Sequence, residues 1–413
     1  MRYPVMYRAR YALPAPYIEN VHEEVKKVFK KARFWKKLKK GARVAVTAGS
    51  RGISDIVPVL MTTLEILKEN HLQPYLVPAM GSHGGGTPEG QKKVLAALGI
   101  TEETTGVPIK ATGEAAKLGE IAPEVPVYFN KAALESDGII VVNRVKPHTS
   151  FHGPVESGLM KMLAIGLGNP QGAAALHRFG PRGLKEYIPL VAQFILANLP
   201  VLYGIAIIEN AREQTAHIEG VEPEDFFHKE QQLLNQARSL MPRLPFQELD
   251  LLIVREMGKC FSGTGMDTNL IGRLRIQGEP EPETPRIKRI AVLDLAARSE
   301  GNATGIGLAD FATDRLLSKV DWEVTYLNVL STTFVQRAMV PMHFPTEEET
   351  IQMALRSLGS ENPHKARVLV IQNTLELDEV EFSAALIEEA KAHPCLTIIS
   401  EGREMAFNNG TLL

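Results

Sequence analysis

The chain has 413 residues, which at about 150 residues per domain predicts two or three domains with a sizeable buried core. The composition, 44% hydrophobic and 23% charged, excludes global disorder and fibrous or collagen-like architecture. The 46 basic and 48 acidic residues leave a net charge of -2, which gives no electrostatic reason to expect a nucleic-acid partner or a membrane surface.

The cysteines and the apolar segments predict a soluble, cytoplasmic protein. Cys260 and Cys395 stand alone, so neither a disulfide framework nor a cysteine metal cluster is expected. The first residues lack the apolar core of a signal peptide. Tyr187 to Ile208 is uncharged and long enough to cross a bilayer, but its prolines and glycine favour a helix, a break at Pro200 and a buried strand.

Short β-branched runs alternate with segments of helical period, which predicts two α/β domains with mainly parallel sheets. In the first half, strands are expected at Arg43 to Ala48, Gln73 to Pro78, Gly138 to Asn143 and Val201 to Ile208. Helices are expected at Asp55 to Asn70, after the Thr87-Pro88 pair, at Gly183 to Asn198 and at Phe226 to Leu240.

Pro242 and Pro245 separate the last of these helices from a new strand, which predicts a domain boundary near residue 245. The domains are then 1–245, carrying the cofactor site, and 246–413, closing a substrate cleft between them. Strands of the second domain are expected at Leu251 to Val254, Ile290 to Leu293, Val324 to Asn328, Val368 to Gln372 and Thr397 to Ser400. A homo-oligomer is possible.

The first candidate site is the turn after the strand that ends at Ala48. Ser50 and Arg51 lie between glycines just before a helix, where backbone N–H groups and a guanidinium suit a phosphate or carboxylate. A simple turn with a solvent-exposed arginine fits the same residues.

The second candidate site follows the next strand. His83 precedes three glycines, which allow the backbone to approach a ligand closely, and imidazole is the usual group for proton transfer near neutral pH. The alternative is that His83 only caps the helix after Thr87.

The third candidate region begins after the strand that ends at Asn143. His148 and His152 come first, and Lys161 and His177 follow, 16 residues apart. On one helix that spacing places two side chains about 160° apart. We expect Gly166, Gly168 and Asn169-Pro170 to break the helix, with Asn169 as the cap of a new one, so that Lys161 and His177 can share a site. Partial burial would make Lys161 a nucleophile, whereas the alternative is a lysine that extends from an amphipathic helix into solvent.

In order and spacing, these residues resemble the nickel-dependent lactate racemase family, which are 2-hydroxyacid racemases and epimerases. The resemblance rests on Arg51 before the glycine-flanked His83, on Pro147-His148, and on the interval between Lys161 and His177. It extends to Asp267-Thr-Asn269 in the second half. This chain departs from the family pattern in two places. The interval between Pro147-His148 and Lys161 is longer than in the family and contains His152. Ile271-Gly272 stands where lactate-specific members have a Tyr-Gln pair.

The resemblance implies a nickel-pincer nucleotide, a pyridinium joined to Lys161 through a sulfur-containing arm, with His177 as the nickel ligand. It implies Ser50 and Arg51 as cofactor-binding residues, and it implies His83 with either His148 or His152 as the proton-transferring pair. Of these two we expect His148, because it follows Pro147 at the end of the strand. Because Arg273 and Arg275 stand where the family contacts substrate, a larger or more polar 2-hydroxyacid than lactate is expected.

Two other functions fit the same residues. One is a nickel-free isomerase or lyase in which Lys161 forms a Schiff base or acts as a general base. The other is a protein that binds a small molecule or metal without turnover.

Overall fold

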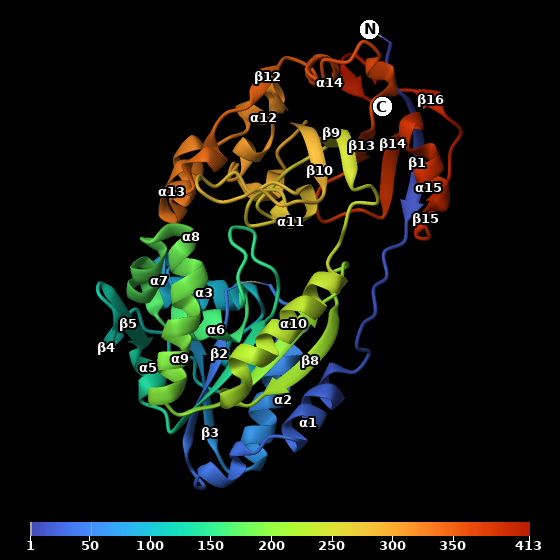
Figure 1. Cartoon of the computed structure of the whole chain (residues 1–413). Helices are drawn as coiled ribbons and strands as arrows, with labels where there is room; N and C mark the ends of the chain where they lie inside the picture. Colours follow the sequence, from blue (N-terminus) through green and yellow to red (C-terminus); the bar gives the residue numbers. More distant parts are fainter. Residues whose placement is uncertain (1, 51) are drawn as a thin grey trace. The chain divides into compact units, whose positions relative to one another are not determined.

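The computed structural model of the protein describes residues 2–50 and 52–413 and divides into two compact units (Figure 1). The N-terminal unit is Pro14–Met241, and the C-terminal unit combines the residues up to Leu13 with Pro242–Leu413. The expected domain 1–245 differs from this division at its start. Strand β1 (Val5–Tyr11) forms antiparallel ladders with β14 (Glu379–Ser383) and β15 (Leu396–Ile398), so the first residues belong to the C-terminal unit.

A five-stranded sheet forms the centre of the N-terminal unit, in the order β3-β2-β6-β7-β8. All its pairs are parallel except β7 with β8. The strands are β2 (Arg43–Ala48), β3 (Gln73–Pro78), β6 (Gly138–Arg144), β7 (Val201–Glu209) and β8 (Thr215–Val221), with a separate hairpin of β4 (Ala115–Ala122) and β5 (Val125–Asn130). The helices are α1 (Val21–Lys30), α2 (Ile56–Glu69), α3 (Pro88–Ala97), α4 (Glu102–Thr105), α5 (Lys131–Leu134), α6 (Leu159–Lys161), α7 (Asn169–His177), α8 (Gly180–Arg182), α9 (Ile188–Asn198) and α10 (Phe226–Leu240).

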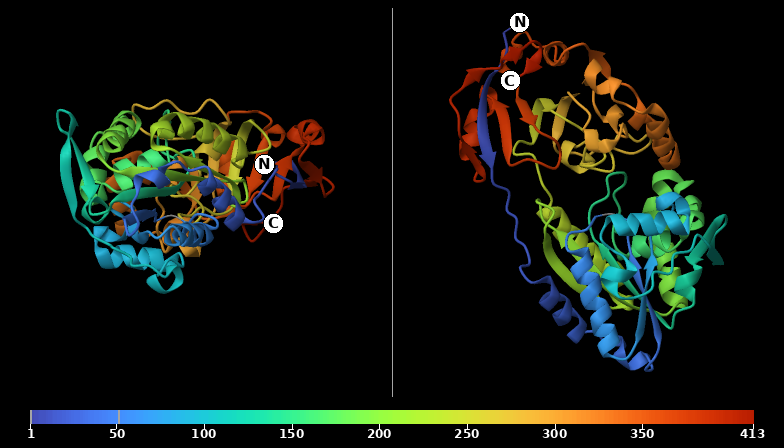
Figure 2. Two further views of the ribbon diagram at one scale, coloured as in Figure 1. Left: turned by 90° about the horizontal axis from the view of Figure 1, so that it is seen from below. Right: turned by 180° about the vertical axis from the view of Figure 1, so that it is seen from behind.

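Helices cover both faces of this sheet, as expected for buried parallel strands (Figure 2). On one face Val44 and Val46 of β2 pack into a core with apolar residues of α1 and α2. On the other face Gly204 of β7 lies under α6 and α10, since a Cβ there would stand 2.5 Å from Leu159 and 2.8 Å from Phe226. A larger residue would therefore push both helices off the sheet.

The C-terminal unit contains a nine-stranded sheet in the order β12-β11-β10-β9-β13-β14-β1-β15, with β16 paired to β1. The pairs from β12 to β13 are parallel and the others antiparallel. Its further strands are β9 (Glu248–Val254), β10 (Arg286–Val292), β11 (Phe311–Thr313), β12 (Met342–Phe344), β13 (Val368–Ile371) and β16 (Arg403–Glu404), with a separate pair of β17 (Phe407–Asn408) and β18 (Thr411–Leu412). Its helices are α11 (Thr268–Ile271), α12 (Asp314–Ser318), α13 (Trp322–Thr332), α14 (Glu347–Arg356) and α15 (Ile387–Ala392).

The strand expected at Val324 to Asn328 is wrong, because this segment lies inside α13. Asp321 caps the helix by accepting the N–H of Val324. Thr325, fully buried, accepts the N–H of Ala303 and fixes the helix on its unit, whereas Leu327 and Leu330 are exposed. The β-branched residues that favoured a strand are outweighed by the cap and by this packing.

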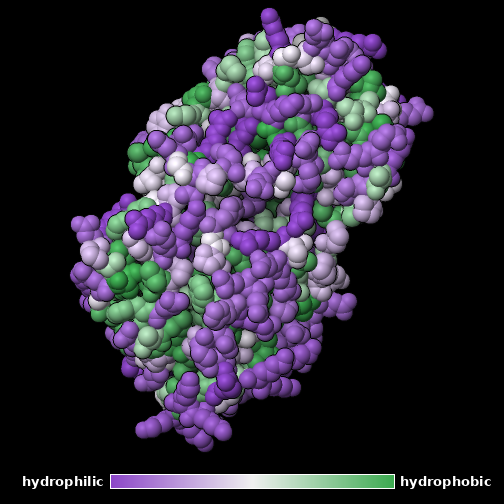
Figure 3. Space-filling view, in the orientation of Figure 1, coloured by the Kyte–Doolittle hydropathy of each residue, from purple (hydrophilic) through white to green (hydrophobic). Residues whose placement is uncertain are grey.

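The surface of the described residues is mainly hydrophilic on the face shown in Figure 3, with hydrophobic side chains in separate patches. The uncharged segment that begins at Tyr187 contains the short helix α9 followed by β7. Among the described residues, no helix has both the length and the apolar character needed to span a membrane.

Candidate active site

The topology of the N-terminal sheet gathers three of the predicted site segments at one edge. Strand β2 lies between β3 and β6, and all three run parallel, so the loops after their carboxyl ends are neighbours. Ser50 follows β2 and His83 follows β3, and the Ser50 hydroxyl is hydrogen-bonded to Nδ1 of His83. Arg51, which was expected beside them, lies outside the described residues.

The glycines after His83 give its loop a conformation that other residues rarely adopt. Gly84, Gly85 and Gly86 have φ values of 67°, 66° and 68°. A Cβ on Gly86 would stand 2.4 Å from the Pro170 ring at the start of α7, so the loop lies directly on that helix. Thr87 caps α3 by accepting the N–H of Gly90 at 3.1 Å. His83 is therefore not the cap, and the alternative role considered for it is wrong.

The expected helix break between Lys161 and His177 is present. Lys161 ends α6, a π-helical turn runs from Met162 to Gly166, and α7 begins at Asn169. The role expected for Asn169 is wrong, because its side chain caps no helix. It is fully buried with φ 55°, and its amide nitrogen donates to the carbonyl oxygens of Thr112 and Glu114 at 3.0 Å each. The loop before β4 therefore holds the break in place.

His177 and Lys161 interact electrostatically across this break. Burial, and to a smaller extent the positive charge of Lys161, together lower the pKa of His177 from 6.5 to about 4. Such an effect requires the two side chains to be near one another. At neutral pH the imidazole is uncharged, which is the form that can donate a lone pair to a metal ion.

A buried carboxylate organises the loop that carries His148 and His152. The loop is closed by a bridge between Lys146 and Ser157. The Glu156 side chain is fully buried, and its Oε2 accepts the His148 N–H at 2.5 Å. Its Oε1 lies 3.3 Å from Nδ1 of His152 and also accepts the Arg238 guanidinium at 2.7 Å.

The two histidines of this loop differ in their hydrogen bonds. Nδ1 of His148 accepts the N–H of Ser150 at 3.0 Å, so its neutral ring carries the proton on Nε2. Nδ1 of His152 faces the Glu156 carboxylate, to which it can only donate, so Nε2 of its neutral ring keeps a lone pair. His152 thus has the tautomer of a proton acceptor, and His148 has that of a hydrogen-bond donor.

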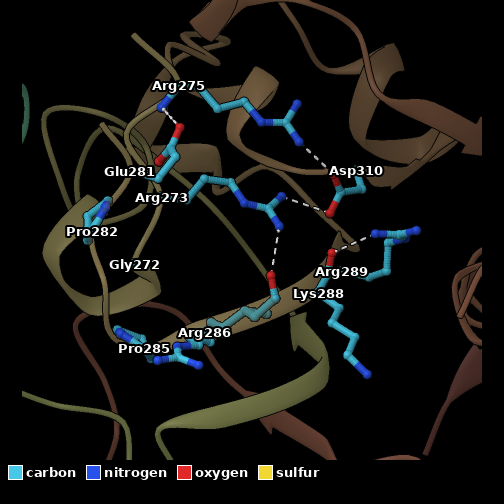
Figure 4. A pocket seen from close by; sticks show the side chains of 11 residues that line it. Gly272, Arg273, Arg275, Glu281, Pro282, Pro285, Arg286, Lys288, Arg289 and Asp310 are labelled. Atoms are coloured by element: carbon cyan, nitrogen blue, oxygen red, sulfur yellow. Dashed lines mark hydrogen bonds and ion pairs between the residues drawn. The ribbon is translucent and has the colours of Figure 1, made fainter. Parts of the chain in front are cut away.

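Arg273 and Arg275 lie in the C-terminal unit, where they line a pocket of about 450 Å³ (Figure 4). Both guanidinium groups point at Asp310, with N to O distances of 2.7 and 2.6 Å. Arg273 also donates to the carbonyl oxygens of Leu308 and Ile287 at 2.9 and 3.1 Å. Arg273 therefore has a structural role, and substrate binding by either arginine stays a prediction.

Sequence reasoning gave no role to three ionisable residues around the site. Glu156 lies four residues after His152, and this spacing was the one available signal. Glu230 and Arg238 come from α10, far away in sequence, where nothing distinguishes them from surface residues of a polar helix. Among the described residues, no three His, Cys, Asp or Glu side chains form a metal-binding group.

Two comparisons with known proteins bear on the identity of the chain. Residues 5–179, which carry every candidate of the N-terminal unit, match the family model "Lactate racemase N-terminal domain". This segment belongs to that domain family. The lactate racemase apoprotein of Thermoanaerobacterium thermosaccharolyticum has a similar fold, with a TM-score of 0.54 at 12% identity over 90% of this chain and 98% of that one. No curated protein matches the chain.

Proposed function

We propose that the protein is a racemase or epimerase of a 2-hydroxyacid that carries a nickel-pincer nucleotide on Lys161. The observation that carries the proposal is the pairing of Lys161 with a partly buried, neutral His177, in a segment that matches the lactate racemase N-terminal domain. Ser50 and Arg51 are proposed to bind anionic groups of the cofactor, and Arg273 and Arg275 those of the substrate.

The residues present fit such a cofactor. A lysine amine supplies the point of attachment, and square-planar nickel with soft donors takes one imidazole nitrogen as its remaining ligand. His177 offers that nitrogen unprotonated, since its pKa of about 4 lies well below neutrality. When bound, the cofactor would supply a hydride acceptor for the substrate carbon, a step that protein side chains cannot perform.

The chain's own contribution is proton transfer at the substrate hydroxyl, which requires one group for each enantiomer. His83 is one candidate, because a neutral ring that donates from Nδ1 to the Ser50 hydroxyl carries its lone pair on Nε2. We propose His152 as the second proton acceptor because Glu156 orients its Nδ1. His148 would then donate a hydrogen bond from Nε2 to the substrate.

The decisive experiment is intact mass and metal analysis of protein produced together with cofactor maturation enzymes. We expect an added mass on Lys161 and one bound nickel. Lys161→Ala should lose both, and His177→Ala should keep the added mass and lose nickel. Lys131→Ala is a matched control, because that lysine is exposed and pairs with Glu114. Protein with neither added mass nor nickel would refute the cofactor assignment.

A second experiment separates this mechanism from the nickel-free alternatives. Inversion of 2-hydroxyacids is followed by chiral chromatography over lactate, malate-like diacids and sugar acids, with deuterium on the reacting carbon. Hydride transfer to and from a bound cofactor would not exchange this hydrogen freely with water, so most of the deuterium should remain in the product. Rapid loss of deuterium to solvent would favour an isomerase in which Lys161 or a histidine acts as the base, and binding without inversion would favour a non-catalytic protein.

A further inference from the structure

Helix α10 contacts the turn that carries Lys161. Glu230 of α10 is fully buried, and its Oε2 accepts the N–H of Met160 at 2.9 Å. A Cβ on Gly158 would stand 2.4 Å from the Glu230 carboxyl carbon, so the carboxyl group fills the space that this glycine leaves. The residue before Lys161 is thus fixed by a side chain 70 positions away in sequence.

The same helix also contacts the loop that carries the two histidines. Arg238 donates to the buried Glu156 carboxylate at 2.7 Å, and Glu156 in turn accepts the His148 N–H and faces His152. Without Arg238 this buried carboxylate would lose a charged partner, which is costly in a low-dielectric interior.

Glu230 and Arg238 lie on one side of α10. Their spacing of eight residues is two helical turns plus about 80°. The helix itself is held by the buried side chains Phe226, Leu233, Leu234 and Ala237. Phe226 packs on β7 at Gly204, so α10 is attached to the central sheet. A helix fixed in this way can set the distance between the segments that it holds.

We propose that α10 is a positioning element in which Glu230 holds the Lys161 turn and Arg238, acting through Glu156, holds the His148–His152 loop. Both act through other residues, Met160 and Glu156, and we therefore assign them positioning roles. The catalytic part of this inference rests on the function proposed above. The placement of the two segments can be tested without it.

Hydrogen exchange of the cofactor-free protein tests the placement. Glu230→Leu should speed exchange of the backbone amides from 159 to 163 by about fivefold, the effect of losing roughly 1 kcal/mol of hydrogen bonding. Glu230→Gln keeps an acceptor and should restore slow exchange. Arg238→Ala should speed exchange from 148 to 156 and leave 159–163 unchanged. Gln232→Ala, an exposed change on the same helix, should alter neither.

The catalytic role is tested in the loaded enzyme by Arg238→Ala, which is expected to fold because the side chain is 41% exposed. We expect kcat to fall about tenfold with KM within about twofold, since geometry and not binding is disturbed, and Arg238→Lys to restore most of the loss. Unchanged exchange in both segments, or a uniform increase across the N-terminal unit, would overturn the positioning role. An unchanged kcat beside faster exchange would overturn its part in catalysis. Absence of turnover in the parent enzyme would count against the proposed function alone, because the exchange experiment does not depend on it.

Discussion

The low pKa of His177 can be tested by removing the charge of Lys161. Burial is the larger cause of the lowered pKa and the lysine charge the smaller. In Lys161→Met the pKa should therefore rise above about 4 but stay below 6.5, since burial remains. The full shift in the parent protein corresponds to a cost on the order of 3 kcal/mol for protonating the partly buried imidazole.

The sign of the pH dependence follows from proton uptake. Between pH 4 and 6.5 the unfolded chain protonates His177 and the folded protein does not, so the free energy of unfolding rises with pH across this window. The slope contributed by one group is at most about 1.4 kcal/mol per pH unit. His177→Gln should remove this contribution, and Lys161→Met should reduce it.

The assay is an NMR titration of the imidazole signals, with His177→Gln for assignment, combined with denaturant unfolding at several pH values. Lys131→Met is the control, because it removes an exposed charge that pairs with Glu114 and should leave the pKa of His177 unchanged. Titration of His177 at or above 6.5 in the parent protein would refute the argument from burial. An unchanged pKa in Lys161→Met would refute the proximity of the two side chains.

Three further outcomes are expected from unfolding experiments. Burial raises the pKa of Glu230 from 4.5 to about 8, so its contribution to the free energy of unfolding should fall as pH rises from 4.5 to 8. Glu230→Gln should flatten this pH dependence of stability. An unaltered pH profile in the variant would contradict the raised pKa. Asn169→Ala should lower the free energy of unfolding by about 2 to 4 kcal/mol, because the Thr112 and Glu114 carbonyls lose the Asn169 donor and alanine is strained at φ 55°. A loss below about 0.5 kcal/mol would show that the loop adapts. Gly86→Ala should lower the free energy of unfolding by about 1 to 3 kcal/mol, because its Cβ would clash with Pro170 and its φ is 68°. Gly85→Ala should lower it less, because Gly85 has a similar φ but open space around it. Equal losses of stability in the two variants would exclude the Pro170 contact as the cause.

The sequence predicts the N-terminal sheet well because its strands are short apolar runs between turn residues. The expected bounds of β2 and β3 agree with the structure at both ends. The predictions that were wrong depend on contacts with residues farther along the chain. Nothing near β1 indicates that it pairs with β14, whose residues lie more than 300 positions away. At α13 the local β-branched pattern favoured a strand, but the cap at Asp321 and the packing of Thr325 stabilise a helix.

For the candidate site, the sequence supplied the groups with chemistry but not the groups that orient them. Histidines beside glycines and a lysine before a helix break can be recognised from local pattern, because loops and breaks have local causes. Glu230 and Arg238 cannot, since they act on residues 70 and 82 positions earlier through tertiary packing. Asn169 shows the same limit, because its residue type suggested a helix cap while its side chain spans to the 112–114 loop.

Burial acts in opposite directions on the pKa values of two groups in this unit and gives both the neutral form near pH 7. It lowers the pKa of His177 and raises that of Glu230. A neutral His177 keeps the lone pair that a metal requires, and a neutral Glu230 can still accept the Met160 N–H without placing a negative charge beside Lys161. The Met160 N–H, next to Lys161, is therefore held by an acceptor that is mainly uncharged near pH 7.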